Sequence, residues 1–117
     1  MFVTAVVLSM VLLVVFAASG VQKVVGAKLM HDTAEHFRLS ARTVQGIGAL
    51  ELAGSAGLLV GLSFAPLGIA AAAGLATLMV LAVIFHVRES DPPGRIAAPA
   101  VLGLIAAAAI FARAASF

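Results

Sequence analysis

Four long apolar segments make up most of the chain, and short polar stretches separate them. The segments cover about residues 1–22, 41–62, 66–88 and 96–115, and a helix of about 20 residues is enough to cross a hydrocarbon core of about 30 Å. The pattern therefore predicts an all-α membrane protein. We expect residues 1–117 to form a single transmembrane domain, folded as a four-transmembrane-helix bundle.

The longest polar interruption covers about residues 23–40 and contains the stretch HDTAEHFRLS. Apolar residues recur within it, so it is either a short interfacial helix or an ordered loop. Ser40 is a suitable N-cap for the second span, and Pro66 fits the first turn of the third. The stretch Asp91-Pro92-Pro93-Gly94 is expected to form a turn before the fourth span.

Composition supports the membrane interpretation. The chain is 63% hydrophobic and 10% charged, whereas soluble domains have about 45–50% apolar and about 25% charged residues. The absence of cysteine excludes thiol redox chemistry and thiolate metal sites. We expect no nucleic-acid partner, because the few basic residues are better explained as topology signals. The first segment is too long for a signal-peptide core and no basic residue precedes it, which favours a span.

Basic residues predict the orientation. Six of the 7 lie in or beside the first and third loops, and Arg113 alone lies on the other side. By the positive-inside rule, the polar loop of about residues 23–40 is expected to be cytoplasmic, with the N-terminus and the C-terminus both outside.

Glu51 is the ionisable residue expected near the bilayer midplane, about 16 Å from the outer end of its span by helical rise. An intramembrane carboxyl is costly and is a functional candidate by default. We expect Glu51 to face the bundle interior, to be neutral, and to form a hydrogen bond across helices. Its expected partners are Thr77, Ser55 or Ser9, or Lys23 reaching down from the inner face. It acts either as a proton carrier or ligand-binding group, or as a structural link between two helices.

A second polar group is expected at the cytoplasmic ends of the spans. It includes Lys23, Arg42, Gln45, His86 and Arg88. These side chains either converge around a polar headgroup or a quinone carbonyl, with His86 as a proton donor, or they are anchors that extend to the interface. We expect no metal site, because His31 and His36 lie five residues apart without a convincing third ligand.

Small residues are expected to let the helices approach closely. Ala49, Ala53, Gly57 and Gly61 form a row at four-residue spacing on the face opposite Glu51. Such rows are typical of tightly packed membrane helices.

Three stretches together identify a family resemblance. FAASGVQKVVG ends the first span, IGALELAGSAGLLVG forms the second, and FHVRESD ends the third. In this combination the chain resembles the DoxX-like family of small four-helix bacterial membrane proteins. The residues that match the family pattern are Ser19, Gly20, Lys23, Glu51, His86 and Arg88. The resemblance implies quinone-linked redox work, but the chain supplies no redox centre of its own.

Three functions remain open at this point. The leading hypothesis is a membrane subunit that binds a quinone or another isoprenoid lipid and supports an oxidoreductase complex, with no intrinsic cofactor and a cofactor-bearing partner subunit. The alternative is a self-contained enzyme of isomerase, cyclase or epoxide hydrolase type, with Glu51 as the acid or base. The second alternative is a passive scaffold. Each would be a multi-pass protein in the bacterial cytoplasmic membrane, alone or as a homo-oligomer.

Overall fold

The computed structural model describes residues 1–116, and these residues form five helices and no strand. The helices are α1 Phe2–Val24, α2 Lys28–Phe37, α3 Ala41–Gly61, α4 Ala65–Arg88 and α5 Pro93–Ala115. All except α2 are long and apolar enough to cross a membrane. The predicted all-α, four-span membrane protein is therefore confirmed.

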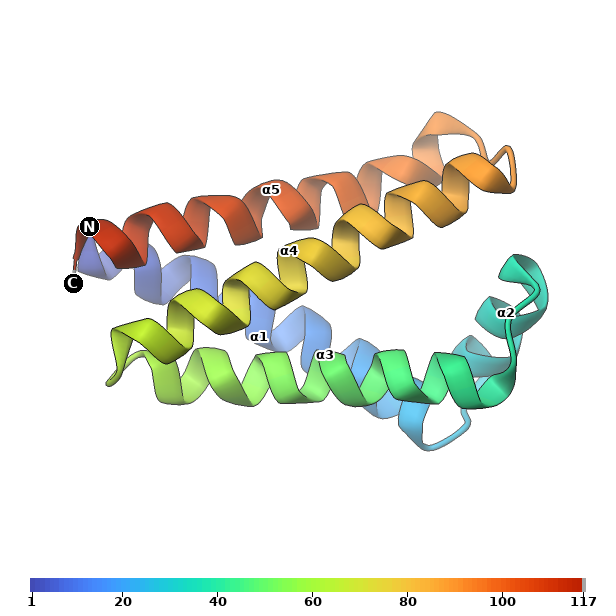
Figure 1. Cartoon of the computed structure of the whole chain (residues 1–117), viewed down its shortest axis with the longest axis horizontal. Coiled ribbons are helices and arrows are strands. Elements are labelled where there is room, and N and C mark those ends of the chain that lie inside the picture. The colour runs from blue at the N-terminus through green and yellow to red at the C-terminus, as the bar shows by residue number, and fades with distance from the viewer. Residues whose placement is uncertain (117) are drawn as a thin grey trace.

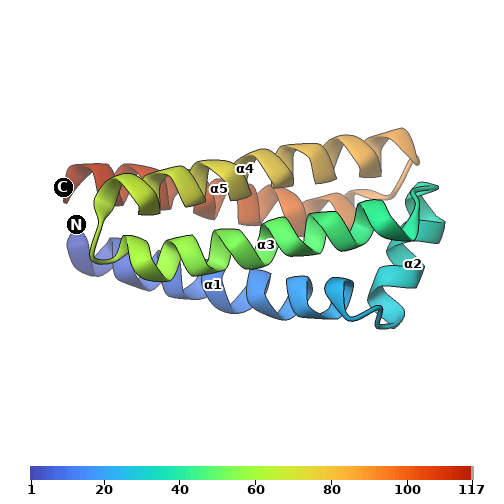
Figure 2. The same cartoon turned by 60° about the horizontal axis from the view of Figure 1, so that its bottom comes forward.

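The four long helices form an antiparallel bundle, and α2 lies across one end of it (Figure 1). The bundle measures 41 × 28 × 16 Å. Neighbouring pairs around the bundle are α1 with α3, α3 with α4, α4 with α5, and α5 with α1. Figure 2 shows both termini at the end that carries the α3–α4 turn, whereas α2 and the α4–α5 turn lie at the opposite end. We call the end with α2 the basic end, because it carries every Lys and Arg except Arg113.

Local signals explain most helix boundaries. The Ser40 hydroxyl accepts a hydrogen bond from the Thr43 amide at 3.1 Å and so caps α3 as predicted. Pro66 lies in the first turn of α4, where its missing N–H does no harm. The polar interruption forms the helix α2, whose own residue Met30 is buried. The orientation of the bundle across the membrane stays a prediction.

The start of α5 differs from the prediction. The turn was expected to include Pro93 and Gly94, with the helix beginning near residue 96, but α5 already begins at Pro93. Pro92 is the N-cap, and proline in the first helical turn is favourable because its φ angle is already helical. The chain reverses one step earlier, at Ser90, whose φ of 56° lies in the left-handed region.

Close helix contacts depend on glycine, but not along the single row expected from the sequence. Gly61 packs so tightly on α4 that an added Cβ would lie 2.2 Å from the Gly68 Cα, and a Cβ on Gly57 would lie 2.8 Å from Ala71. Ala49 and Ala53 are exposed on the outside of the bundle. Ala49 and Ala53 therefore face outward, whereas Gly57 and Gly61 contact α4. The row changes its surroundings along α3 because α4 crosses α3 at an angle (Figure 1).

Apolar residues fill the interior between the four helices. The core cluster consists of Leu12, Phe16, Leu58, Ala72, Leu75, Met79, Ala106 and Ala109. At the terminal end, Arg113 donates hydrogen bonds to the Gly61 and Leu62 carbonyls, each at 3.3 Å. These bonds satisfy carbonyls that the end of α3 leaves free, and the positive charge complements the helix dipole there.

Candidate functional site

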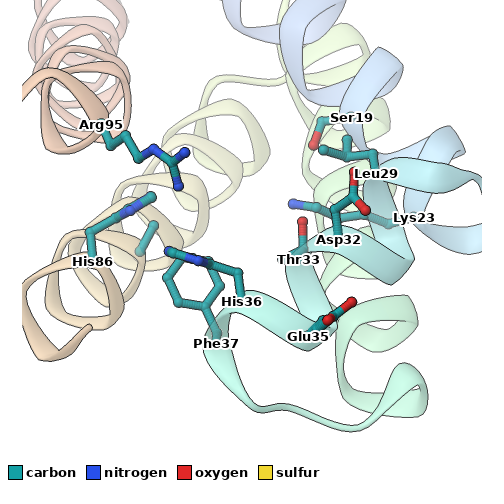
Figure 3. Close-up of a pocket in the computed structure, with 11 residues that line it drawn as sticks. Ser19, Lys23, Leu29, Asp32, Thr33, Glu35, His36, Phe37, His86 and Arg95 are labelled. Atoms are coloured by element: carbon teal, nitrogen blue, oxygen red, sulfur yellow. The ribbon is translucent and has the colours of Figure 1, made fainter. Parts of the chain in front are cut away.

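Two neighbouring cavities occupy the basic end of the bundle. The larger one has a volume of about 620 Å³, and we call it the polar cavity. Its lining comes from α1, α2, α4 and α5 (Figure 3), and consists of Ser19, Lys23, Leu29, Asp32, Thr33, Glu35, His36, Phe37, Ala82, His86 and Arg95. Its size lies within the range of about 300–1,000 Å³ that is usual for ligand pockets.

The second cavity lies deeper, has a volume of about 160 Å³, and is called here the inner cavity. Its polar wall is formed by Lys23, Thr33 and Glu51, and the rest is apolar: Phe37, Leu39, Ile47, Leu78, Met79, Leu81, Ala82 and Phe85. Lys23, Thr33, Phe37 and Ala82 line both cavities. Glu51 and His86 thus belong to different but adjoining cavities.

Lys23 and Glu51 form an ion pair at the wall between these cavities. The Lys23 Nζ donates to Glu51 Oε1 at 2.5 Å, and the Glu51 residue is only 1% exposed. Glu51 therefore faces the interior and is bonded across helices, as predicted. Lys23 does not extend toward the interface as an anchor; its side chain runs inward to a residue in the middle of α3. The neutral state expected for Glu51 stays a prediction.

A close crossing of α1 and α3 makes this pairing geometrically feasible. A Cβ on Gly48 would lie 2.6 Å from the Lys23 Cβ and 3.0 Å from the Gly20 carbonyl oxygen. Only a residue without a side chain fits at this crossing. Because the two backbones approach so closely, the lysine stem can lie along α3 and reach Glu51, which lies about one helical turn deeper.

The hydroxyl partners proposed for Glu51 have other roles. Ser55 donates to the Glu51 backbone carbonyl at 2.9 Å, one helical turn back. Thr77 is exposed and donates to Ala73 on its own helix at 2.9 Å. The expectation that Thr77 approaches Glu51 from the same depth is wrong, because depth along a helix does not determine which side of it a residue occupies. Among the described residues, Lys23 is the side chain that donates to the Glu51 carboxyl.

Thr77 instead lines a groove between α3 and α4 on the outer surface of the bundle. We call this feature the lateral groove; it has a volume of about 590 Å³ and its lining is almost entirely apolar. Leu78 and Leu81 line both the lateral groove and the inner cavity. An apolar surface therefore continues from the lipid-facing side of α4 to the neighbourhood of Glu51.

His86 meets two residues that the sequence did not group with it. Its Nδ1 atom lies 2.5 Å from Asp91 Oδ2, and His36 Nε2 on α2 lies 2.8 Å from the same oxygen. Phe37 packs edge-on to both imidazole rings, with centroids 4.8 Å and 4.9 Å away. The hydrogen bond from His36 holds the pKa of the Asp91 carboxyl below its ordinary value, His86 acts in the same direction, and burial opposes both.

Further polar contacts attach the end of α2 to the end of α4. Arg38 binds both carboxylate oxygens of Glu89, with N–O distances of 3.0 Å and 3.1 Å from one nitrogen. Arg88 donates to the Phe37 carbonyl at 3.0 Å, and its guanidinium lies 5.0 Å from the centre of the Phe85 ring. Together with the His36–Asp91 contact, these bonds hold α2 over the polar cavity.

Besides Thr77, three of the predicted site residues lie outside the two cavities. Arg42 is exposed, Arg88 is committed to α2, and Gln45 donates to the Val24 carbonyl at 3.3 Å. Their roles as ligand contacts stay predictions, and the structure places them around the site rather than in it. The residues that sequence reasoning missed are His36, Asp91, Arg95 and Asp32. The sequence offered one signal for Asp91: it follows His86 by five residues at the end of a span. A turn at that point brings the carboxylate back to the last turn of the helix, next to His86.

Comparison with known proteins gives one match. The family model described as the DoxX-like family matches residues 7–109. Comparisons with the curated proteins and with the solved structures give no match. The match begins within α1, ends within α5 and includes every residue that lines the two cavities, so Lys23, Glu51 and His86 all lie within it.

Proposed function

The chain belongs to the DoxX-like family, and from that premise we propose that this small integral membrane protein binds a quinone or another isoprenoid lipid and supports a membrane oxidoreductase complex. The observation that carries the proposal is the succession of polar cavity, inner cavity and lateral groove. A lipid with a polar ring and a long apolar tail matches this order, with its ring toward the polar cavity and its tail toward the lateral groove.

The head of such a ligand fits the boundary between the two cavities. Quinone carbonyls accept hydrogen bonds, and an ammonium group offers three donors, of which Glu51 uses one. Lys23 lines both cavities and so presents its remaining donors where a ring would lie. Phe37 and Phe85 supply aromatic faces at the same level. His86 lines the polar cavity and is the proton donor proposed on that side.

The tail has an apolar route to the lipid. From the inner cavity it would pass Leu78 and Leu81 and lie in the lateral groove between α3 and α4. Ala53, Gly54 and Gly57 have little or no side chain, and so leave room for a tail on the α3 side of that groove. An isoprenoid chain in this position would be partly covered by protein and partly by lipid.

The proposed electron transfer involves a partner subunit that carries a cofactor, because the chain has no thiol for redox chemistry. We propose that a cofactor-bearing subunit docks at the basic end, beside the polar cavity. The proposal puts the chain in the bacterial cytoplasmic membrane, with this end inside.

The enzyme alternative depends on the inner cavity. With a volume of about 160 Å³, it is smaller than the usual range of about 300–1,000 Å³ for ligand pockets. The Glu51 carboxyl is also already bonded to Lys23. The small volume and the contact of Lys23 with Glu51 Oε1 together favour a binding role.

Native mass spectrometry of the gently solubilised protein is the first test. We expect a stoichiometric quinone or a related isoprenoid lipid, together with a flavin- or metal-bearing subunit. Another hydrophobic metabolite, without a partner, would favour the enzyme alternative. Bulk phospholipid alone would refute ligand binding and leave the scaffold.

Matched lysine variants locate the site. The purified chain in nanodiscs is titrated with decylubiquinone, and binding is measured by equilibrium dialysis. Lys23→Met should weaken binding at least about tenfold, which corresponds to about 1.4 kcal/mol, or one hydrogen bond from a charged donor. Lys28→Met is the control, because Lys28 is exposed and outside both cavities. Equal binding by the two variants would contradict the proposed position of the head group.

A further inference from the structure

His36, His86 and Asp91 bring three potential ligand atoms together from three parts of the chain. His36 lies on α2, His86 in the last turn of α4, and Asp91 in the α4–α5 turn. All three ligand atoms lie within 4.8 Å of one another. We propose that this cluster binds a divalent transition-metal ion of the zinc or ferrous-iron class.

The donor chemistry selects this class of ion. Two imidazole nitrogens and one carboxylate oxygen suit Zn²⁺ and Fe²⁺, whereas Ca²⁺ and Mg²⁺ prefer oxygen alone and Cu⁺ prefers sulfur. Two histidines and one carboxylate, with the remaining positions open, are a recurring arrangement in zinc and non-haem iron sites. The chain has no cysteine to compete for the ion.

The spacing is close to what an ion needs. Ligands at about 2.0–2.1 Å from a tetrahedral ion lie about 3.3 Å apart. Asp91 Oδ2 lies 2.8 Å from the His36 nitrogen and 2.5 Å from the His86 nitrogen. Both nitrogens therefore have to move away from Asp91 Oδ2 by less than about 1 Å, and the widest separation in the cluster, no more than 4.8 Å, has to close to about 3.3 Å, which small side-chain rotations provide. The His36 and His86 side chains are 35% and 19% exposed, so an ion can reach the cluster from the solvent side.

The surroundings preorganise the cluster and leave it accessible. Phe37 packs against both rings and limits their orientation. The Arg38–Glu89 pair and the Arg88 bond to Phe37 hold α2 against α4, and therefore His36 against His86. Both histidines line the polar cavity, so water or a ligand can reach the open coordination positions. Asp32 and Glu35 in the same wall offset the positive charge of Arg95.

Metal binding is measured on the purified, untagged chain in detergent, because a polyhistidine tag would itself bind the ion. After stripping with a chelator, the protein is loaded with Zn²⁺, dialysed, and analysed by inductively coupled plasma mass spectrometry. We expect about one zinc per chain. His36→Ala, His86→Ala and Asp91→Asn should each weaken binding more than about 100-fold, since loss of an outer-shell partner alone costs about 10–100-fold.

His31→Ala is the matched control. His31 is exposed on the same helix as His36 and takes no part in the cluster, so its variant should bind zinc like the parent chain. Circular dichroism and size-exclusion chromatography show whether each variant stays folded.

X-ray absorption on the zinc-loaded parent chain gives a readout that needs no variant, and should show two imidazole ligands. Less than stoichiometric zinc, equal binding by Asp91→Asn, loss of zinc in His31→Ala, or a spectrum without imidazole would overturn the proposal and leave a hydrogen-bonded clamp. No quinone enters this experiment, so its outcome is independent of the proposed function.

Discussion

Replacing Lys23 by Met should destabilise the bundle more than replacing Glu51 by Leu, although both changes break the same ion pair. The two side chains differ in whether they can reach water once the pair is broken. Glu51 is 1% exposed in the middle of α3 and, among the described residues, has no other side-chain donor. Lys23 lies near the end of α1 with its side chain 16% exposed, so it can turn toward the basic end when its partner is lost.

The magnitudes follow from this asymmetry. A buried charge left without its partner costs about 3–5 kcal/mol, and a buried polar group that loses its bond costs about 1–3 kcal/mol. We expect Lys23→Met to cost about 3 kcal/mol, where the two ranges meet. Glu51→Leu should cost about 1 kcal/mol, the net value of one hydrogen bond. The double variant should lie within about 1 kcal/mol of the parent chain, because removing both partners of a buried pair is often nearly neutral.

The assay uses the absence of cysteine, tryptophan and tyrosine from the chain. Intrinsic indole fluorescence is therefore not a usable signal, but introduced cysteines are labelled uniquely. Dyes on Thr4→Cys and Ser63→Cys report the distance between α1 and the α3–α4 turn during titration with sodium dodecyl sulfate, which yields free energies of unfolding. A coupling energy of about 4 kcal/mol is expected, because the single effects of about 3 and about 1 kcal/mol should nearly vanish in the double variant. If the two single effects instead add to within about 0.5 kcal/mol, the pair does not connect α1 to α3.

Three further predictions concern other parts of the molecule. Gly48→Ala should cost about 1–3 kcal/mol in the same assay, because its Cβ would lie 2.6 Å from the Lys23 Cβ, whereas Gly46→Ala meets no atom within 4 Å and should cost nothing; equal effects would contradict the close crossing of α1 and α3. Arg38→Ala should speed amide hydrogen exchange in Lys28–Phe37 by up to about fivefold, which corresponds to about 1 kcal/mol for an exposed ion pair. Arg42→Ala, at another exposed arginine, should leave this exchange unchanged. Unchanged exchange in both variants would show that the Arg38–Glu89 pair does not hold α2. In intact cells a membrane-impermeant maleimide should label Ser63→Cys but not Lys28→Cys, and the reverse pattern would invert the predicted orientation.

Sequence reasoning located features that depend on the solvent and on neighbours along the chain. Hydropathy identified the four spans because a bilayer requires each segment to satisfy its own backbone hydrogen bonds as a helix. Ser40 and Pro66 marked helix starts because capping is decided within one turn. The burial of Glu51 followed from the cost of exposing a carboxyl group to lipid.

Features that depend on how helices rotate against each other could not be derived in this way. Thr77 has the expected depth but faces the lateral groove, and only the packing of α4 on α3 decides this. Lys23 was one of four expected partners of Glu51, and only the close approach of α1 to α3 at Gly48 selects it; the two paired residues are 28 positions apart. His36 and Asp91 are 55 positions apart and meet only because α2 folds back over the end of the bundle. Long-range contacts of this kind leave no periodic signal in one sequence.

The packed core has a consequence for the membrane that surrounds the protein. On the terminal side of Glu51, side chains such as Leu12, Phe16 and Leu58 fill the space between the helices. Water that enters the polar cavity thus reaches the Lys23–Glu51 pair and meets a hydrocarbon plug beyond it. A chain built in this way can hold charged groups within the membrane while its packed interior keeps the path across the bilayer closed to water and ions.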